Sequence, residues 1–141
     1  MSRIMALDLG EATIGVAISD PLGVTAQPLV TVKRAGWRRD LEALQDLIAR
    51  HEVAHVIVGL PLRMGGEEGT AARGTLDFSR RLADAIDIPV SSWDERLTSV
   101  QAERILLEAD VSRRRRREVV HQMAAAIILQ SWLDSRAAGA P

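Results

Sequence analysis

The feature that most constrains the fold is an N-terminal pair of apolar segments separated by an acidic residue and a glycine. The first segment, Ile4-Met5-Ala6-Leu7, runs into Asp8-Leu9-Gly10, and a second apolar segment follows from Ile14 to Ser19. This pattern predicts strands over residues 3–9 and 14–19, joined as an antiparallel hairpin. An ionised carboxylate at the end of such a strand is costly unless something cationic lies against it. Asp8 is therefore either a ligand for a hard cation such as magnesium or manganese, or a residue that caps the turn.

The rest of the chain alternates between strand and helix patterns. Further strands are expected over residues 27–33, 55–60 and 88–93. Helical spacing of apolar residues covers residues 37–51, 70–86, 98–110 and 118–135. Three meandering strands followed by alternating helices and strands predict an α/β domain with a five-stranded mixed sheet flanked by helices. That is the order of elements in the ribonuclease H-like fold.

Length and composition set further limits. The 141 residues are expected to form one domain over residues 1–135, with a disordered tail over residues 136–141. The absence of cysteine excludes disulfides, thiolate zinc sites and a cysteine nucleophile. No segment resembles a signal peptide or a membrane span, so a cytoplasmic protein is expected. With no tyrosine and one phenylalanine, an aromatic platform for nucleobases is not expected, and Trp37, Trp93 and Trp132 are assigned to the core or to an interface.

The basic residues include one dense cluster, although the chain as a whole carries no excess of positive charge. The net charge is −1, but every basic residue except Lys33 is arginine, and five arginines are consecutive. Guanidinium groups suit phosphate recognition better than ammonium groups do. The run is either a solvated connector before the last helix or a binding site for nucleic-acid phosphates, and its composition favours the second. It consists of Arg113, Arg114, Arg115, Arg116 and Arg117.

Several linked motifs give the chain a family resemblance. It resembles the YqgF/RuvX family of bacterial proteins, which are described as pre-16S rRNA nucleases and as Holliday-junction-resolvase-like. The resemblance extends over almost the whole chain, and several motifs in the right order are far more specific than any one of them. In chain order the motifs are Asp8-Leu9-Gly10, Ile14-Gly15-Val16-Ala17, Ser19-Asp20-Pro21, Thr25-Ala26-Gln27-Pro28, Val58-Gly59-Leu60-Pro61-Leu62, Trp93-Asp94-Glu95-Arg96-Leu97-Thr98, Ala124-Ala125 and Ile128-Leu129-Gln130-Ser131.

The resemblance implies a divalent-metal nuclease with three acidic positions, served by Mg²⁺ or Mn²⁺. The first two fall on Asp8 and Glu95, and Arg96 and the arginine run are assigned to nucleic-acid binding. The third position, usually an aspartate, falls on His121, which is a departure from the family pattern. A second departure is the turn after Gly10, where an acidic residue, Glu11, stands in place of the family's basic residues.

The chemistry of these residues leaves some alternatives open. Side chains alternate along a strand, so Asp94 and Glu95 cannot both face one site; Glu95 is chosen, although it could instead pair with an arginine. Imidazole ligates manganese and also acts as a general base near neutral pH. It is a poorer ligand for magnesium than carboxylate is. His121 therefore either shifts the metal preference toward manganese or weakens catalysis.

The resulting functional hypothesis is a metal-dependent nuclease that processes the 5′ end of pre-16S rRNA in ribosome biogenesis. One alternative is a resolvase of branched DNA in recombination and repair, which would need a dimer with two sites. A second is a nucleic-acid-binding protein with weakened catalysis. A sugar-kinase-like ATPase is set aside, because it would need two such domains and a second Asp-x-Gly motif, and this chain has one of each. The expected partners are nucleic acids, with no membrane, and the expected state is a monomer or a weak homodimer.

Overall fold

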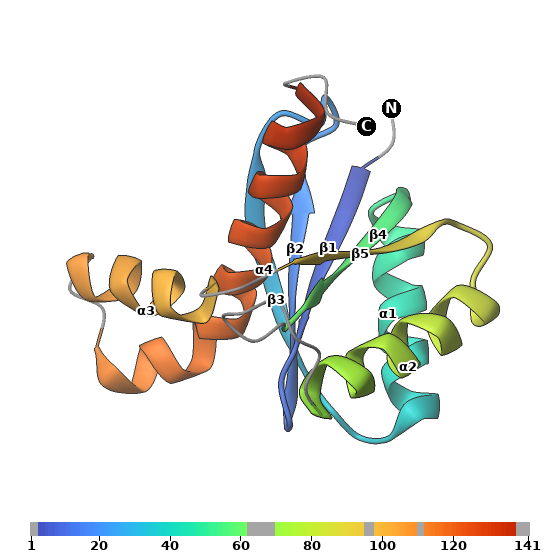
Figure 1. Cartoon of the computed structure of the whole chain (residues 1–141), viewed down its shortest axis with the longest axis horizontal. Helices are drawn as coiled ribbons and strands as arrows, with labels where there is room; N and C mark the ends of the chain where they lie inside the picture. Colours follow the sequence, from blue (N-terminus) through green and yellow to red (C-terminus); the bar gives the residue numbers. More distant parts are fainter. Residues whose placement is uncertain (1–2, 62–69, 95–97, 110–111, 138–141) are drawn as a thin grey trace.

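The computed structural model describes residues 3–61, 70–94, 98–109 and 112–137 (Figure 1). Within these ranges the chain folds into strands and helices in the order that the sequence predicts. The elements are β1 (Arg3–Leu9), β2 (Thr13–Ser19), β3 (Ala26–Lys33), α1 (Trp37–Arg50), β4 (Val53–Leu60), α2 (Thr70–Ala85), β5 (Val90–Asp94), α3 (Thr98–Glu108) and α4 (Arg113–Ala137).

The strands form one mixed sheet in the order β3-β2-β1-β4-β5. The N-terminal three strands pair in antiparallel fashion, and β1 pairs in parallel with β4, which pairs in parallel with β5. The hairpin predicted from the first apolar segments is confirmed, as is the five-stranded mixed sheet. Strand β5 begins at Val90 rather than at residue 88, because Pro89 has no N–H to donate to the ladder, although its carbonyl accepts from Val56.

Helices cover both faces of the sheet (Figure 1). On one face, Leu44 of α1 and Leu82 of α2 pack with Met5 and Leu7 in a fully buried core. On the other face, α4 packs over β1, β2 and β3, where Ala6 is among the buried residues. The alternation of side chains along β1 thus separates two cores, one for each face.

The last helix is longer than the sequence pattern predicts. The expectation that the arginine run is a connector before a helix at residues 118–135 is wrong, because α4 begins at Arg113 and continues to Ala137. Arginine has a high helix propensity, and Ser112 caps the helix by accepting a hydrogen bond from the Arg115 N–H at 3.2 Å. Helix α3 packs against α4, and the two form a hairpin beside the sheet (Figure 1). Of the expected tail, Arg136 and Ala137 are helical, and residues 138–141 lie outside the described residues.

Over the described residues, none of the helices combines the length and the apolar character needed to cross a membrane.

Candidate active site

Asp8 lies near the carboxyl end of β1 on the face that α4 covers. Its neighbours Met5 and Leu7 belong to the core on the α1 and α2 side, whereas Ala6 belongs to the α4 side. The alternation places Asp8 with Ala6, and its side chain reaches α4. Asp8 is 3% exposed, so its carboxylate is almost removed from water. A charged group at such a place requires a partner.

The partner is His121 of α4. The Nδ1 atom of His121 lies 2.7 Å from Oδ2 of Asp8. A carboxylate only accepts hydrogen bonds, so Nδ1 carries a proton and donates it. This hydrogen bond raises the pKa of His121 above its ordinary value, and partial burial of the ring opposes the rise. The structure therefore joins two of the three predicted site residues, 113 positions apart in sequence, in one charge-assisted contact.

Two glycines allow this contact. Gly15 is the direct neighbour of Asp8 on β2, and α4 passes over it so closely that a side chain there would overlap the His121 carbonyl. At Gly10, a Cβ atom would lie 2.9 Å from both Cε1 and Nε2 of His121. The imidazole edge that bears Nε2 therefore lies against the β1–β2 turn. Both glycines belong to motifs that carry the family resemblance, and the structure gives their physical role.

Polar contacts to β3 and to the turn before it fix the position of α4. Gln122 donates to the Thr31 hydroxyl at 3.1 Å, directly beside His121. Two turns later, Gln130 accepts from the Ala26 N–H at 2.9 Å and donates to the Val24 carbonyl at 3.1 Å. The sequence analysis assigns no role to either glutamine, although Gln130 belongs to one of the family motifs. The signal was present as two glutamines eight positions apart, which lie near one face of a helix.

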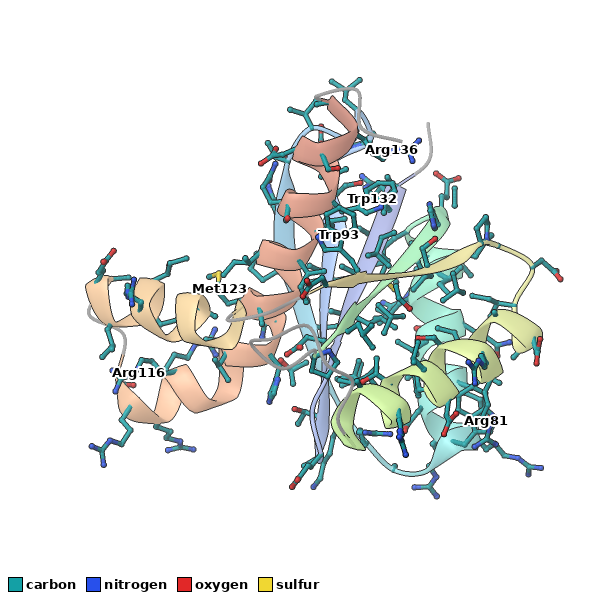
Figure 2. The ribbon with its side chains drawn as sticks, in the orientation of Figure 1. Arg81, Trp93, Arg116, Met123, Trp132 and Arg136 are labelled. Carbon is teal, nitrogen blue, oxygen red and sulfur yellow. The ribbon has the colours of Figure 1, made fainter. Side chains whose placement is uncertain are left out.

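The other predicted site residues are placed less completely. Glu95 and Arg96 lie outside the described residues. Trp93 packs against the core on the α4 side (Figure 2), so strand alternation directs the adjacent Asp94 to the opposite face, away from Asp8. The choice of Glu95 stays a prediction.

The arginine run forms the first turns of α4. Arg113, Arg114 and Arg115 are exposed and Arg116 is half-buried, whereas the side chain of Arg117 is not described. Arg117 precedes His121 by about one helical turn, and Arg113 lies ~12 Å along the helix from it. The run therefore leads along α4 toward the Asp8–His121 pair.

The donor chemistry at Asp8 fits a hard divalent cation. A carboxylate has two oxygens that accept, and the contact with His121 uses Oδ2. Within the described ranges, no cluster of three or more His, Cys, Asp or Glu side chains could hold a metal ion. Asp8 and His121 are two of the three expected donors, and the third, Glu95, is outside those ranges.

Comparison with known proteins identifies the family. Residues 2–135 match the family model described as "RuvX: Holliday junction resolvase". The chain belongs to the RuvX family. A relative from Myxococcus xanthus (strain DK1622) is 55% identical over 133 residues, which cover 94% of this chain and 88% of the relative. One from Syntrophomonas wolfei is 50% identical over 137 residues, 97% of each chain. Both carry the name "Putative pre-16S rRNA nuclease". The RuvX family member described here is therefore a phosphodiester-hydrolysing enzyme of the nuclease class.

Solved structures confirm the ribonuclease H-like fold. RuvC from T. thermophilus in complex with a Holliday junction substrate matches with a TM-score of 0.58 and 17% identity, over 96% of each chain. The Fowlpox virus resolvase, solved with Holliday junction DNA, matches with a TM-score of 0.55 and 12% identity, over 95% of this chain and 98% of that one. At these identities the similarity establishes the fold.

Proposed function

We propose that this RuvX protein is a divalent-metal-dependent nuclease that trims the 5′ end of pre-16S rRNA. The observation that carries the proposal is the 2.7 Å contact between Asp8 and His121 at the carboxyl end of β1. It occurs in a chain that is at least 50% identical to the two relatives named above. A role in rRNA processing would place the protein in the cytoplasm, and cleavage of a single strand needs no more than a monomer or a weak homodimer.

In this proposal Asp8, Glu95 and His121 would hold Mg²⁺ or Mn²⁺; because Nδ1 of His121 faces Asp8, its Nε2 would bind a different ion from the one on Asp8. The bound cation supplies positive charge to the phosphate oxygens and makes water more acidic. Asp8 also orients His121, because the hydrogen bond to Nδ1 fixes the ring and its tautomer. Nε2 is then the atom left to bind a cation or to accept a proton from water. In the second role, the Asp8 carboxylate stabilises the imidazolium that forms.

The start of α4 supplies the proposed phosphate-binding surface. Helices usually have acidic residues in their first turn, where the helix dipole is positive, but α4 has none and has arginines instead. Like charges at this end disfavour the isolated helix, while the dipole and the guanidinium groups together attract anions. Guanidinium groups at the positive end of a helix dipole are the arrangement that phosphate binding would use.

Neutralising the arginine run tests this surface. Replacing Arg113 to Arg117 with glutamine is expected to weaken RNA binding and to flatten its salt dependence. Each lost phosphate contact should reduce the log–log slope by about 0.7. Binding measured by fluorescence anisotropy across a salt series checks the prediction. Changing Arg38 and Arg39, which are exposed on α1, to glutamine shows what the loss of two positive charges elsewhere on the surface does to the slope. If the arginine-run variant has the wild-type slope, the run does not contact the phosphates of the RNA.

The metal preference tests His121. Carboxylate oxygens suit magnesium and imidazole suits softer ions, so the wild type should cleave faster in manganese than in magnesium. His121→Asp restores the family pattern and should raise the magnesium activity, whereas His121→Ala should lower activity in both metals, by about 10- to 100-fold. Initial cleavage rates in each metal measure these effects. Wild-type rates for His121→Ala in both metals would make His121 a purely structural residue.

A side-by-side assay tests the proposed substrate. Labelled pre-16S rRNA and a four-way DNA junction are incubated with the protein in magnesium and in manganese. Faster cleavage of the RNA at its 5′ extension is expected. The family description favours a second candidate, resolution of Holliday junctions. Symmetric cleavage of the junction without RNA cleavage would support that candidate, and binding without cleavage of either substrate would indicate a protein with lost catalysis.

A further inference from the structure

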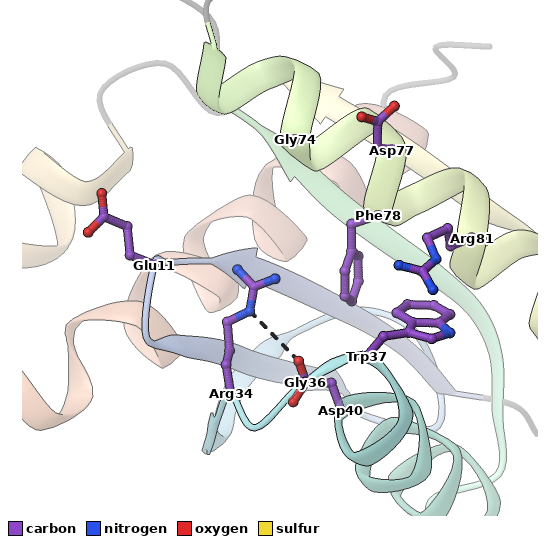
Figure 3. Close-up of a pocket in the computed structure, with 9 residues that line it drawn as sticks. All are labelled: Glu11, Arg34, Gly36, Trp37, Asp40, Gly74, Asp77, Phe78 and Arg81. Carbon is purple, nitrogen blue, oxygen red and sulfur yellow. Dashed lines mark ion pairs between the residues drawn. The ribbon is translucent and has the colours of Figure 1, made fainter.

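The proposed catalytic chemistry leaves one cavity unused. It lies at the same end of the sheet as His121, but on the face that α1 and α2 cover. It has a volume of 480 Å³ and lies between the β1–β2 turn, the start of α1 and α2 (Figure 3). Its walls include Glu11, Arg34, Trp37, Phe78 and Arg81. This volume is within the ~300–1,000 Å³ range of pockets that hold small molecules.

The cavity continues toward the active site. A neighbouring hollow of 230 Å³ shares Glu11, Arg34 and Gly74 with it. That hollow is also lined by Leu9 and Gly10, which directly follow Asp8 in sequence. We call the two spaces together the trough. A strand that passes Asp8 at the end of β1 would therefore have the trough directly beside it.

Arg34 is held in position where the two spaces meet. It donates from Nη1 to the Gly10 carbonyl at 2.8 Å, and its Nε lies 3.8 Å from Oδ2 of the buried Asp40. The guanidinium group has five N–H donors, and the bond to Gly10 uses one of them. Its side chain is 34% exposed, so it combines a fixed position with access to solvent. This is the preorganisation that a binding residue needs.

The opposite wall offers a flat surface for stacking. The guanidinium carbon of Arg81 lies 4.3 Å from the centroid of the Trp37 ring, and Trp37 meets Phe78 edge to face at 5.6 Å. Figure 3 shows Arg81 beside the Trp37 ring, with Phe78 between this pair and Arg34. Unstacked nucleobases stack on guanidinium planes as well as on aromatic rings. The single phenylalanine of the chain lies here, although no aromatic platform was expected from the composition.

The charges of the cavity favour a base over a bare phosphate. The guanidinium groups of Arg34 and Arg81 share the walls with the carboxylates of Glu11, Asp40 and Asp77. Such a mixture does not attract an anion strongly. A nucleobase, in contrast, presents donors and acceptors on one edge and can use both kinds of group.

Gly74 adds an independent observation. It lies inside α2, where glycine is unfavourable compared with alanine, and it lines both parts of the trough. Among the described residues, no packing neighbour explains the glycine, because a Cβ atom there would meet nothing within 4 Å. The missing side chain instead keeps the trough open where its two parts meet.

We propose that the trough binds one unpaired nucleotide of the substrate strand beside the cleavage site. Its base stacks on Arg81 beside Asp77, and its sugar lies toward Arg34, where the two parts of the trough meet. This inference rests on the proposed function, since it assumes that a nucleic-acid strand passes Asp8. In this proposal the face of the sheet opposite His121 positions the RNA strand. It also requires the RNA to be single-stranded at the bound nucleotide.

The test measures binding without cleavage. Fluorescence anisotropy in EDTA gives the Kd of single-stranded RNAs that carry one abasic nucleotide at successive positions near the mature 5′ end. For the wild type, one position should weaken binding by roughly tenfold, the scale of one lost stacking contact. Arg81→Gln and Gly74→Gln should abolish that position-specific penalty. Arg80→Gln is the matched control, because Arg80 neighbours Arg81 on α2, is exposed and does not itself line the trough; it contacts the wall through an exposed ion pair with Asp77 at 3.8 Å.

The variants keep the outcomes separable. Gly74→Gln should raise the melting temperature, because glutamine favours a helix more than glycine does, so its weaker binding cannot result from unfolding. The inference is overturned if the abasic penalty is the same in Arg81→Gln, Gly74→Gln and Arg80→Gln. It is also overturned if AMP or GMP alone binds as tightly as the RNA, which would indicate a site for free nucleotides. A wild type that binds none of the RNAs would instead count against the proposed function itself.

Discussion

Replacing Asp8 with asparagine is expected to lower the cleavage rate by about 10²- to 10⁴-fold, the scale of losing a principal catalytic group. Asparagine has nearly the same shape, and its amide oxygen can accept the hydrogen bond that His121 now donates to Oδ2. The fold should therefore persist while the negative charge is lost. Without that charge the site can neither hold a divalent cation well nor stabilise an imidazolium at His121.

The matched control for this experiment is Asp94→Asn. Asp94 ends β5 at the same end of the sheet, but it points to the face opposite Asp8. Its substitution should leave the cleavage rate within a few-fold of wild type. Initial rates on labelled pre-16S rRNA, together with a thermal melt of each variant, give the comparison. A fully active and folded Asp8→Asn protein would remove Asp8 from the mechanism.

The pairing of Asp8 with His121 could be anticipated from the sequence because both lie in regular elements. Asp8 lies near the end of a strand that is otherwise a run of apolar residues, and His121 lies on a helix that packs over that strand. Family resemblance then put them in one site. The sequence did not indicate that Nδ1 would face Asp8 and Nε2 would face Gly10, because ring orientation depends on tertiary packing.

The start of α4 and the trough were less predictable, for different physical reasons. Five adjacent arginines resemble a solvated connector, whereas their helix propensity, the cap at Ser112 and the packing of α3 against α4 all favour a helix. The trough joins residues of the β1–β2 turn, the β3–α1 connection and α2, which no periodicity links. A cavity is the space left between packed side chains of different elements. Sequence periodicity predicts which side chains are buried, but not where such a space remains.

Replacing Gly15 with alanine is expected to have the largest effect on stability, because the added methyl group would meet backbone on a facing element. A Cβ atom at this position would overlap the His121 carbonyl and lie 2.5 Å from the Gln122 nitrogen. No rotamer change can relieve a clash between two backbones, so α4 would have to move away from β2. We expect the free energy of unfolding to fall by about 1–3 kcal/mol or more, the cost of overpacking.

The same shift should impair cleavage, because it separates His121 from Asp8. Two further glycines make the comparison specific. At Gly10 a methyl group would meet the end of the His121 ring, which can rotate, so Gly10→Ala should disturb cleavage more than stability. Gly74→Ala meets open space inside a helix and should raise stability by up to about 1 kcal/mol. Urea unfolding of the three variants should therefore order them Gly15→Ala, Gly10→Ala and Gly74→Ala from least to most stable. If Gly15→Ala were as stable as the wild type, the close approach of α4 to β2 would not be what holds His121 against Asp8.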